Sequence, residues 1–196
     1  MKLTKRIAIN FLLAGAIISS LISCSQSQTP KPRGFFRIDL PERSYRMLDS
    51  IFPYKFEYPV YANITNDPNA PDQPYWINLD FPRFKARLHL SYKVVNNNLS
   101  VFAEDAHSMV MKHIPKASAI NELRYDNEKT NVHGIVYDIE GTGAASVYQF
   151  YVTDSTKNFM RGALYFNALP NNDSLAPVID FLKKDIMHLI ETTEWK

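Results

Sequence analysis

The sequence predicts an α+β fold in which an antiparallel β-sheet of about six to seven strands is covered by two main amphipathic helices. Several segments alternate apolar and polar residues with a period of two, which is typical of strands. Two longer segments repeat apolar residues at helical spacing. Short, turn-rich loops separate most of the strand candidates, and such connections favour antiparallel pairing. We therefore expect one layered domain.

The first half of this domain contains three strand candidates. In residues 54–64, Tyr54, Phe56 and Tyr58 fall on one face, and Pro59 indicates a strand end or an edge. A turn-rich loop, residues 65–74, follows. Residues 75–82 and 83–95 are predicted to be two strands interrupted near Pro82. In the second of these, one face carries Phe84, Ala86, Leu88, Leu90, Tyr92 and Val94, and the other carries Lys85, Arg87, His89, Ser91 and Lys93.

The second half is predicted to be a helix, four strands and a final helix. The first helix, residues 99–114, has an apolar face made of Leu99, Phe102, Ala106, Met109, Val110 and His113. The strand candidates span residues 120–126, 132–140, 144–153 and 159–167, with hairpin loops at 141–143 and 154–158. Ser174 is predicted to cap the last helix, residues 175–191, whose buried stripe comprises Val178, Ile179, Leu182, Ile186, Leu189 and Ile190.

The amino terminus has the pattern of an exported lipoprotein. Basic residues precede an apolar run over residues 7–22, which is short for a transmembrane helix. The run ends in Leu21-Ile22-Ser23-Cys24, which resembles a bacterial lipobox. Ser23 and Cys24 would flank the cleavage site, and the Cys24 thiol would carry the lipid. Stable anchoring takes at least two acyl chains, such as palmitate, which a lipoprotein supplies.

These features predict the domain organisation. Residues 1–23 would be the signal peptide, residues 24–34 a lipidated tether rich in Ser, Gln and Pro, and residues 35–196 a single α+β domain. Cys24 is the one cysteine, so the folded domain would contain no thiol for a disulfide or a metal site. The 22 basic and 20 acidic residues nearly balance, and the signal peptide holds three of the basic ones. We therefore expect no nucleic-acid binding.

The sequence gives little indication of catalysis. The five histidines, at positions 89, 107, 113, 133 and 188, form no metal-binding spacing, so we expect no metal or other cofactor. Two short-range pairs, Glu104 with His107 and Asp185 with His188, are more typical of helix support than of catalysis. A nucleophile elbow is missing, and the Gly-Thr-Gly at 141–143 fits a turn better than a nucleotide site. We expect no enzymatic activity.

Two groups of residues are candidate partner contacts. Phe35, Phe36 and Arg37 form either a segment packed on the core or an exposed contact. Arg83, Lys85 and Arg87, together with His89, would lie on one face of one strand. Such charges commonly protect an exposed strand from edge pairing, and alternatively they form a docking stripe for an anionic partner or for lipid headgroups.

Several segments together resemble the GldD gliding-motility lipoproteins of Bacteroidetes. They are the lipobox, PKPRGFFRIDLPE (residues 30–42), YWINLDFP (75–82), LHLSY (88–92) and the terminal FLKKDIMHLIETTEW. The resemblance implies a cell-envelope lipoprotein required for gliding and linked to the type IX secretion machinery, with other envelope proteins as partners. It supplies no catalytic residues. The order of strands and helices also looks like the PsbP-like α/β/α sandwich, which implies a fold and no function.

Two functions from different classes fit these observations, and a third, hydrolysis, would need a serine or a carboxylate pair that converges only in the folded protein. The first is a non-enzymatic accessory or assembly component, tethered to the inner or outer membrane through acyl chains on Cys24, with its domain facing the periplasm. The second is a periplasmic binding module for a lipid or another small apolar ligand, because the domain is rich in aromatic residues.

Overall fold

Two antiparallel sheets and two helices make up the part of the chain that the computed structural model describes, residues 38–167 and 171–196. The chain divides after residue 34, and every described residue belongs to the unit that spans residues 35–196. The elements are β1 (Tyr45–Leu48), β2 (Tyr54–Pro59), β3 (Asn63–Asn66), β4 (Ile77–Phe81), β5 (Ala86–Val94), α2 (Leu99–Met111), β6 (Ala119–Asn127), β7 (Val132–Glu140), β8 (Ser146–Thr153), β9 (Asn158–Phe166), α3 (Asn172–Glu191) and β10 (Glu194–Trp195).

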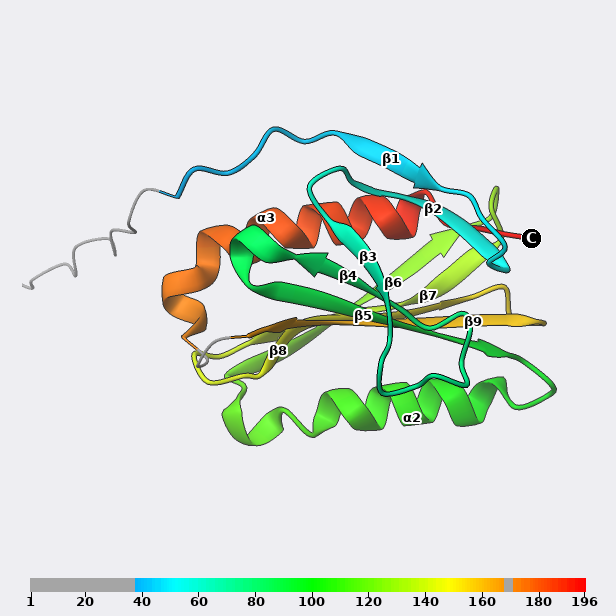
Figure 1. Cartoon of the computed structure of the whole chain (residues 1–196). Helices are drawn as coiled ribbons and strands as arrows, with labels where there is room; N and C mark the ends of the chain where they lie inside the picture. The colour runs from blue at the N-terminus through cyan, green and yellow to red at the C-terminus, as the bar shows by residue number, and fades with distance from the viewer. Residues whose placement is uncertain (1–37, 168–170) are drawn as a thin grey trace, which may run out of the picture. The chain divides into compact units, whose positions relative to one another are not determined.

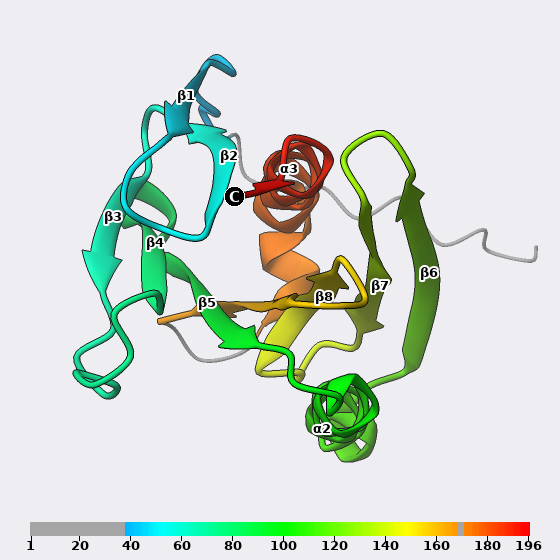
Figure 2. The same ribbon diagram turned by 90° about the vertical axis from the view of Figure 1, so that its right-hand side faces the viewer.

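The larger sheet has seven strands in the order β3-β4-β5-β9-β8-β7-β6, and all neighbours pair antiparallel. It curves around α3, which lies against one face, while α2 lies against the other face (Figures 1 and 2). This arrangement confirms the predicted α+β class, the antiparallel pairing and the two covering helices. The four strands predicted between the helices match β6 to β9 to within two residues at each end.

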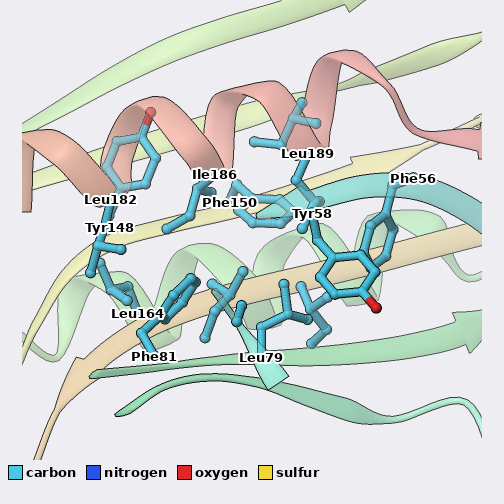
Figure 3. Packing of buried hydrophobic residues seen from close by; sticks show 14 of the residues in the cluster. Phe56, Tyr58, Leu79, Phe81, Tyr148, Phe150, Leu164, Leu182, Ile186 and Leu189 are labelled. Carbon is cyan, nitrogen blue, oxygen red and sulfur yellow. The ribbon is translucent and has the colours of Figure 1, made fainter. Parts of the chain in front are cut away.

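The main core lies between α3 and the apolar face of the larger sheet. Every residue of the predicted α3 stripe is buried, and Leu182, Ile186 and Leu189 point towards Phe150 and Leu164 of the sheet (Figure 3). Burying one such side chain contributes roughly 1.5–3 kcal/mol. The alternation of β5 places Leu88 and Leu90 in this core, and its polar side chains therefore lie on the opposite face of the sheet.

Helix α2 is shorter and less buried than its sequence predicts. It ends at Met111, and a separate 3₁₀ turn at Ile114–Lys116 follows, because Pro115 cannot continue an α-helix. Ala106 and Val110 are buried against the sheet, whereas Met109 is 39% exposed. The prediction that Met109 faces the core was wrong. Helix α2 contacts chiefly β8 and β9, so only a narrow stripe of its surface is covered.

A second, three-stranded sheet has the order β1-β2-β10 and was not predicted. β1 and β10 are too short to show alternation, and they are held by their pairing with β2. Pro59 is the last residue of β2, so it marks a strand end and not an edge. The short strand β3, which pairs with β4 at the end of the larger sheet, was also missed.

Helix α3 begins at Asn172, three residues before the predicted start. The Asn172 side chain donates hydrogen bonds to the carbonyl oxygens of Gly141 (2.7 Å) and Ala144 (3.0 Å), which fixes the start of the helix on the β7–β8 turn. Ser174 therefore lies inside the first turn and is not the cap. The earlier start depends on a tertiary contact that local sequence does not reveal.

A candidate binding groove on the polar face of the larger sheet

The predicted basic stripe does not lie on one strand. Pro82–Phe84 forms a 3₁₀ turn, and Lys85 follows it with a left-handed backbone (φ 49°), so β5 begins only at Ala86. Arg83 is therefore outside the strand, and Phe84 is outside its predicted face. The missing N–H and fixed φ of Pro82 explain this interruption.

The prediction that these charges protect a sheet edge was also wrong. β5 pairs with β4 on one side and with β9 on the other, so it is an interior strand. The alternation continues through Tyr92, but Val94, predicted to face the core, is 55% exposed at the end of the strand. Edge protection therefore cannot explain basic side chains in the middle of the sheet.

The side chains of β5 belong to a polar patch that extends across four strands. Directly paired residues of an antiparallel sheet lie on the same face. One row across the patch contains Asn78, His89, Ala163 and Gln149, and the next row contains Asp80, Arg87, Tyr165 and Ser146. Arg161 follows beside the first row, between Ser91 and Tyr151. Polar groups therefore occupy the centre of the sheet on the face opposite α3.

Two adjoining cavities open this patch to solvent, and His89 lines both. The larger, of about 690 Å³, extends along Lys85, Arg87 and Tyr165. The smaller, of about 250 Å³, lies between α2 and the β3–β4 loop and is lined by Trp76 and Arg161. We call the two cavities together the polar groove. Two of the three basic residues singled out on this stretch, Lys85 and Arg87, line it.

Charge in the polar groove is only partly balanced. The Arg87 side chain donates to Asp80 (2.5 Å), and Thr65 donates to the same carboxylate (2.9 Å), so the hydrogen bonds hold the Asp80 pKa below its usual value although burial opposes this. Burial lowers the pKa of His89, which favours its neutral form. Its ring lies edge-on to Tyr165 with the centroids 5.7 Å apart.

Sequence reasoning missed three central residues of the polar patch, Asn78, Gln149 and Arg161, of which Arg161 lines the polar groove. Asn78 and Gln149 are each 1% exposed, and the Arg161 guanidinium donates to Gln149 Oε1 (2.5 Å). Each is a polar side chain between apolar neighbours in a strand segment, which is an available signal. A buried polar residue in such a segment needs a partner, and this requirement could have singled them out.

A second polar cluster lies on the other side of the molecule, around Asp185. Its carboxylate is buried and accepts hydrogen bonds from Arg43 (3.1 Å), Tyr45 (2.8 Å) and Tyr61. His188 bonds Glu57 (2.6 Å) and stacks on Tyr45 with the centroids 3.8 Å apart. Asp185 and His188 thus have different partners. His107 approaches Glu122, a residue of β6 (3.5 Å).

Several predicted features fall outside the described residues. They are the signal peptide, the cleavage and lipidation site at Ser23 and Cys24, the tether, and the candidate contacts Phe35, Phe36 and Arg37. Within residues 38–167 and 171–196, the His, Asp and Glu side chains form no group of three arranged to hold a metal ion. No helix in that part of the chain combines the length and the apolar character needed to span a bilayer.

Comparisons with known proteins place these features in a family. No curated protein sequence matches the chain. Among solved structures it is similar to the solution structure of cyanobacterial PsbP (CyanoP) from Synechocystis, with a TM-score of 0.48 and 12% identity over 82% of this chain and 98% of that chain. Nothing about function follows from that likeness.

The family comparison extends over nearly the whole chain. The model described as gliding motility lipoprotein GldD matches residues 25–195, from the residue after Cys24 to the penultimate residue. The match includes the polar groove, the Asp185 cluster and both helices. The chain therefore belongs to the GldD family of gliding-motility lipoproteins, and this membership implies a membrane-anchored envelope protein with an accessory role in motility.

Proposed function

We propose that this protein is a non-enzymatic assembly component of the gliding-motility and type IX secretion machinery, held in the membrane by acyl chains on Cys24. The observation that carries the proposal is the family match over residues 25–195, which begins directly after the lipobox cysteine. The folded unit would then face the periplasm at the end of a tether of about ten residues, which spans at most roughly 35 Å when fully extended.

Contacts near the start of the folded unit support an anchoring role. Arg43 and Tyr45 both bond Asp185 of α3, and the Arg43 guanidinium lies 4.3 Å from the centroid of the Phe181 ring. Both residues lie early in the described part of the chain. The Asp185 cluster therefore fixes the tether-proximal segment to the longest helix of the domain.

We further propose that partner proteins contact the rim of the polar groove through Arg83, Lys85 and Arg87, and also contact Phe35, Phe36 and Arg37. Lys85 and Arg83 are exposed, and no ion pair involves either of them among the described residues. The basic side chains Lys85 and Arg87 line the larger cavity of the groove, and they suit an anionic partner better than the small apolar ligand considered as an alternative.

The anchor is tested by complementation of a deletion strain. We expect the Cys24→Ala variant to fail to restore both surface movement and type IX secretion, because the unlipidated domain is no longer held at the membrane. Colony spreading and export of a secreted cargo are the two measurements. A Ser25→Ala variant is the matched control and should complement fully.

Full complementation by Cys24→Ala, at wild-type protein levels, would contradict the anchoring proposal.

The partner proposal has its own test, which is cross-linking in intact cells followed by purification of the tagged protein. Charge reversal at Lys85 and Arg83 should reduce recovery of motility or secretion components without changing the protein level. Recovery of none of these components by the wild-type protein would contradict it.

A further inference from the structure

Arg161 is a charged side chain inside the larger sheet that has no carboxylate counterion. It lies in the middle of β9, where its neighbours across the ladder are Ser91 and Tyr151. Among the described residues it forms no ion pair, and the remaining residues, 1–37 and 168–170, contain no Asp or Glu. A partly buried guanidinium normally requires a paired anion, because desolvation of a lone charge is costly.

The groups that hydrogen-bond Arg161 are neutral. Its guanidinium donates to Gln149 Oε1 and also bonds Tyr165. His89 and His113 lie close enough for its charge to act on them, and burial together with this charge lowers the pKa of both imidazoles. The positive charge of Arg161 is thus only solvated by dipoles and is not neutralised.

Unused hydrogen-bonding atoms lie beside this charge. Gln149 Nε2, both amide atoms of Asn78 and Ser146 Oγ are buried without a partner. Gln149 and Asn78 share one row of the patch, with His89 and the small Ala163 between them, and Ser146 lies in the next row. Buried polar groups are nearly always satisfied in folded proteins, so the polar centre of the sheet holds more hydrogen-bonding capacity than its described groups use. None of these three residues lines a cavity, and Arg161, which bonds Gln149, connects them to the one that it lines.

The site is accessible and has limited room. Arg161 and His89 line the smaller cavity of about 250 Å³, which suits a small organic group, and His89 also borders the larger cavity. Asp67, Asp105 and Lys93 line the smaller cavity together with Arg161, and neither carboxylate pairs with Arg161. The two carboxylates oppose a ligand with two negative charges there, whereas one negative charge can pair with Arg161.

We propose that the polar groove binds a ligand bearing a single carboxylate, which pairs with the guanidinium of Arg161 and uses His89 and Tyr165 as further polar contacts. The carboxylate belongs either to a free small organic acid or to an acidic side chain of a bound peptide, since both present the same planar group to arginine. This proposal is independent of the role in motility.

The test is ligand titration of the full-length lipoprotein purified in detergent. Acetate, N-acetyl-glutamate amide as the peptide-like acid, neutral acetamide and inorganic phosphate are added at equal ionic strength, with chloride as the reference salt. The readouts are the Arg Nε resonances in NMR spectra and the thermal unfolding midpoint. We expect a saturable shift of the Arg161 signal and a raised midpoint with one or both carboxylates, and neither effect with acetamide.

Variants connect the effect to Arg161. Arg161→Gln should weaken carboxylate binding by about tenfold or more, because a charge-assisted hydrogen bond is lost. Arg124→Gln is the matched control, since Arg124 is an exposed arginine on β6 paired with Asp126, and this variant should bind normally. If Arg161→Gln does not fold, Arg161→Lys keeps the charge, loses the planar fork and should still bind more weakly.

Acetate and the peptide-like acid distinguish the two sources of the carboxylate, and binding of either supports the proposal. Three results would overturn it: no saturable response to any carboxylate, an equal response of wild type and the folded Arg161 variant, or tighter binding of phosphate than of carboxylate. Each is obtained on purified protein, so none depends on the outcome of the complementation experiments.

Discussion

At the level of single residues, Asp185 shows how one buried charge links distant parts of the chain. It is 1% exposed on the apolar side of α3, and its partners Arg43, Tyr45 and Tyr61 come from segments more than 120 residues away. Hydrogen bonding to its carboxylate and burial raise the pKa of Tyr45 to about 12, with burial the larger cause. Burial and the hydrogen bond to Asp185 also raise the pKa of Tyr61. Tyr45 and Tyr61 therefore both remain protonated hydroxyl donors at physiological pH.

Replacing Asp185 should destabilise the domain strongly. Asp185→Ala leaves Arg43 without its anion and two hydroxyl groups without their acceptor, so we expect a loss of about 3 kcal/mol in the free energy of unfolding. Urea unfolding of the full-length protein measures it. Asp180→Ala, at an exposed position of the same helix, is the control and should change stability by less than about 0.5 kcal/mol. Equal effects of the two variants would exclude this role of Asp185.

At the level of elements, the β8–β9 hairpin depends on Asp154. Its Oδ1 accepts hydrogen bonds from the backbone N–H groups of Thr156 (2.9 Å), Lys157 (2.7 Å) and Asn158 (2.9 Å), and its Oδ2 accepts one from the Asn158 side chain (2.7 Å). Burial alone would raise the Asp154 pKa, but the hydrogen bonds outweigh it and hold this pKa below its usual value. The carboxylate thereby satisfies donors that the turn leaves without backbone partners.

This lowered pKa predicts an acid-sensitive hairpin. The stabilisation is fully present above the pKa of the unfolded chain, near 4, and is lost as the pH falls through the lower folded-state value. In urea unfolding between pH 6 and pH 2, wild type should lose more stability than Asp154→Asn, whose side chain does not titrate. Parallel pH profiles of the two proteins would contradict the prediction. Asp72→Asn, at an exposed loop position, serves as the control.

At the level of the whole molecule, the larger sheet has two chemically different faces. The face against α3 is apolar and forms the main core, whereas the face against α2 has a polar centre that α2 only partly covers. The arrangement is visible in Figure 2, where α2 lies below β8 while β4 and β5 extend beyond it. The uncovered part of the polar face is where the polar groove opens.

Lipid attachment is the prediction that concerns the molecule as a whole. Metabolic labelling with an alkyne analogue of palmitate should label the wild-type protein, and the Cys24→Ala variant should remain unlabelled and keep its signal peptide. The mass of the purified protein should correspond to a chain that begins at Cys24 and carries acyl groups. A labelled Cys24→Ala variant would place the lipid elsewhere.

Much of the fold could be predicted because its signals are local. The alternation of β5 and the strands β6 to β9 follow from a period of two, and the α3 stripe follows from helical periodicity. The elements that were missed lack such signals. β10 has two residues, and β3 is half polar, so both depend on pairing partners remote in sequence. Lys85 and Arg87 could be identified as candidate contacts from the sequence. The other explanation of their charges, protection of a sheet edge, was wrong because β5 is an interior strand.

The sequence alone was sufficient for the α+β class, the order of its main elements and the family resemblance, because periodicity, turn residues and short motifs act over a few neighbouring residues. Tertiary structure decided that β5 is interior, that Asn78, Gln149 and Arg161 converge beside His89, and that Asp185 joins α3 to the segment following the tether. Those relations depend on strand order and long-range pairing, which the free energy of the whole fold determines and no single segment encodes.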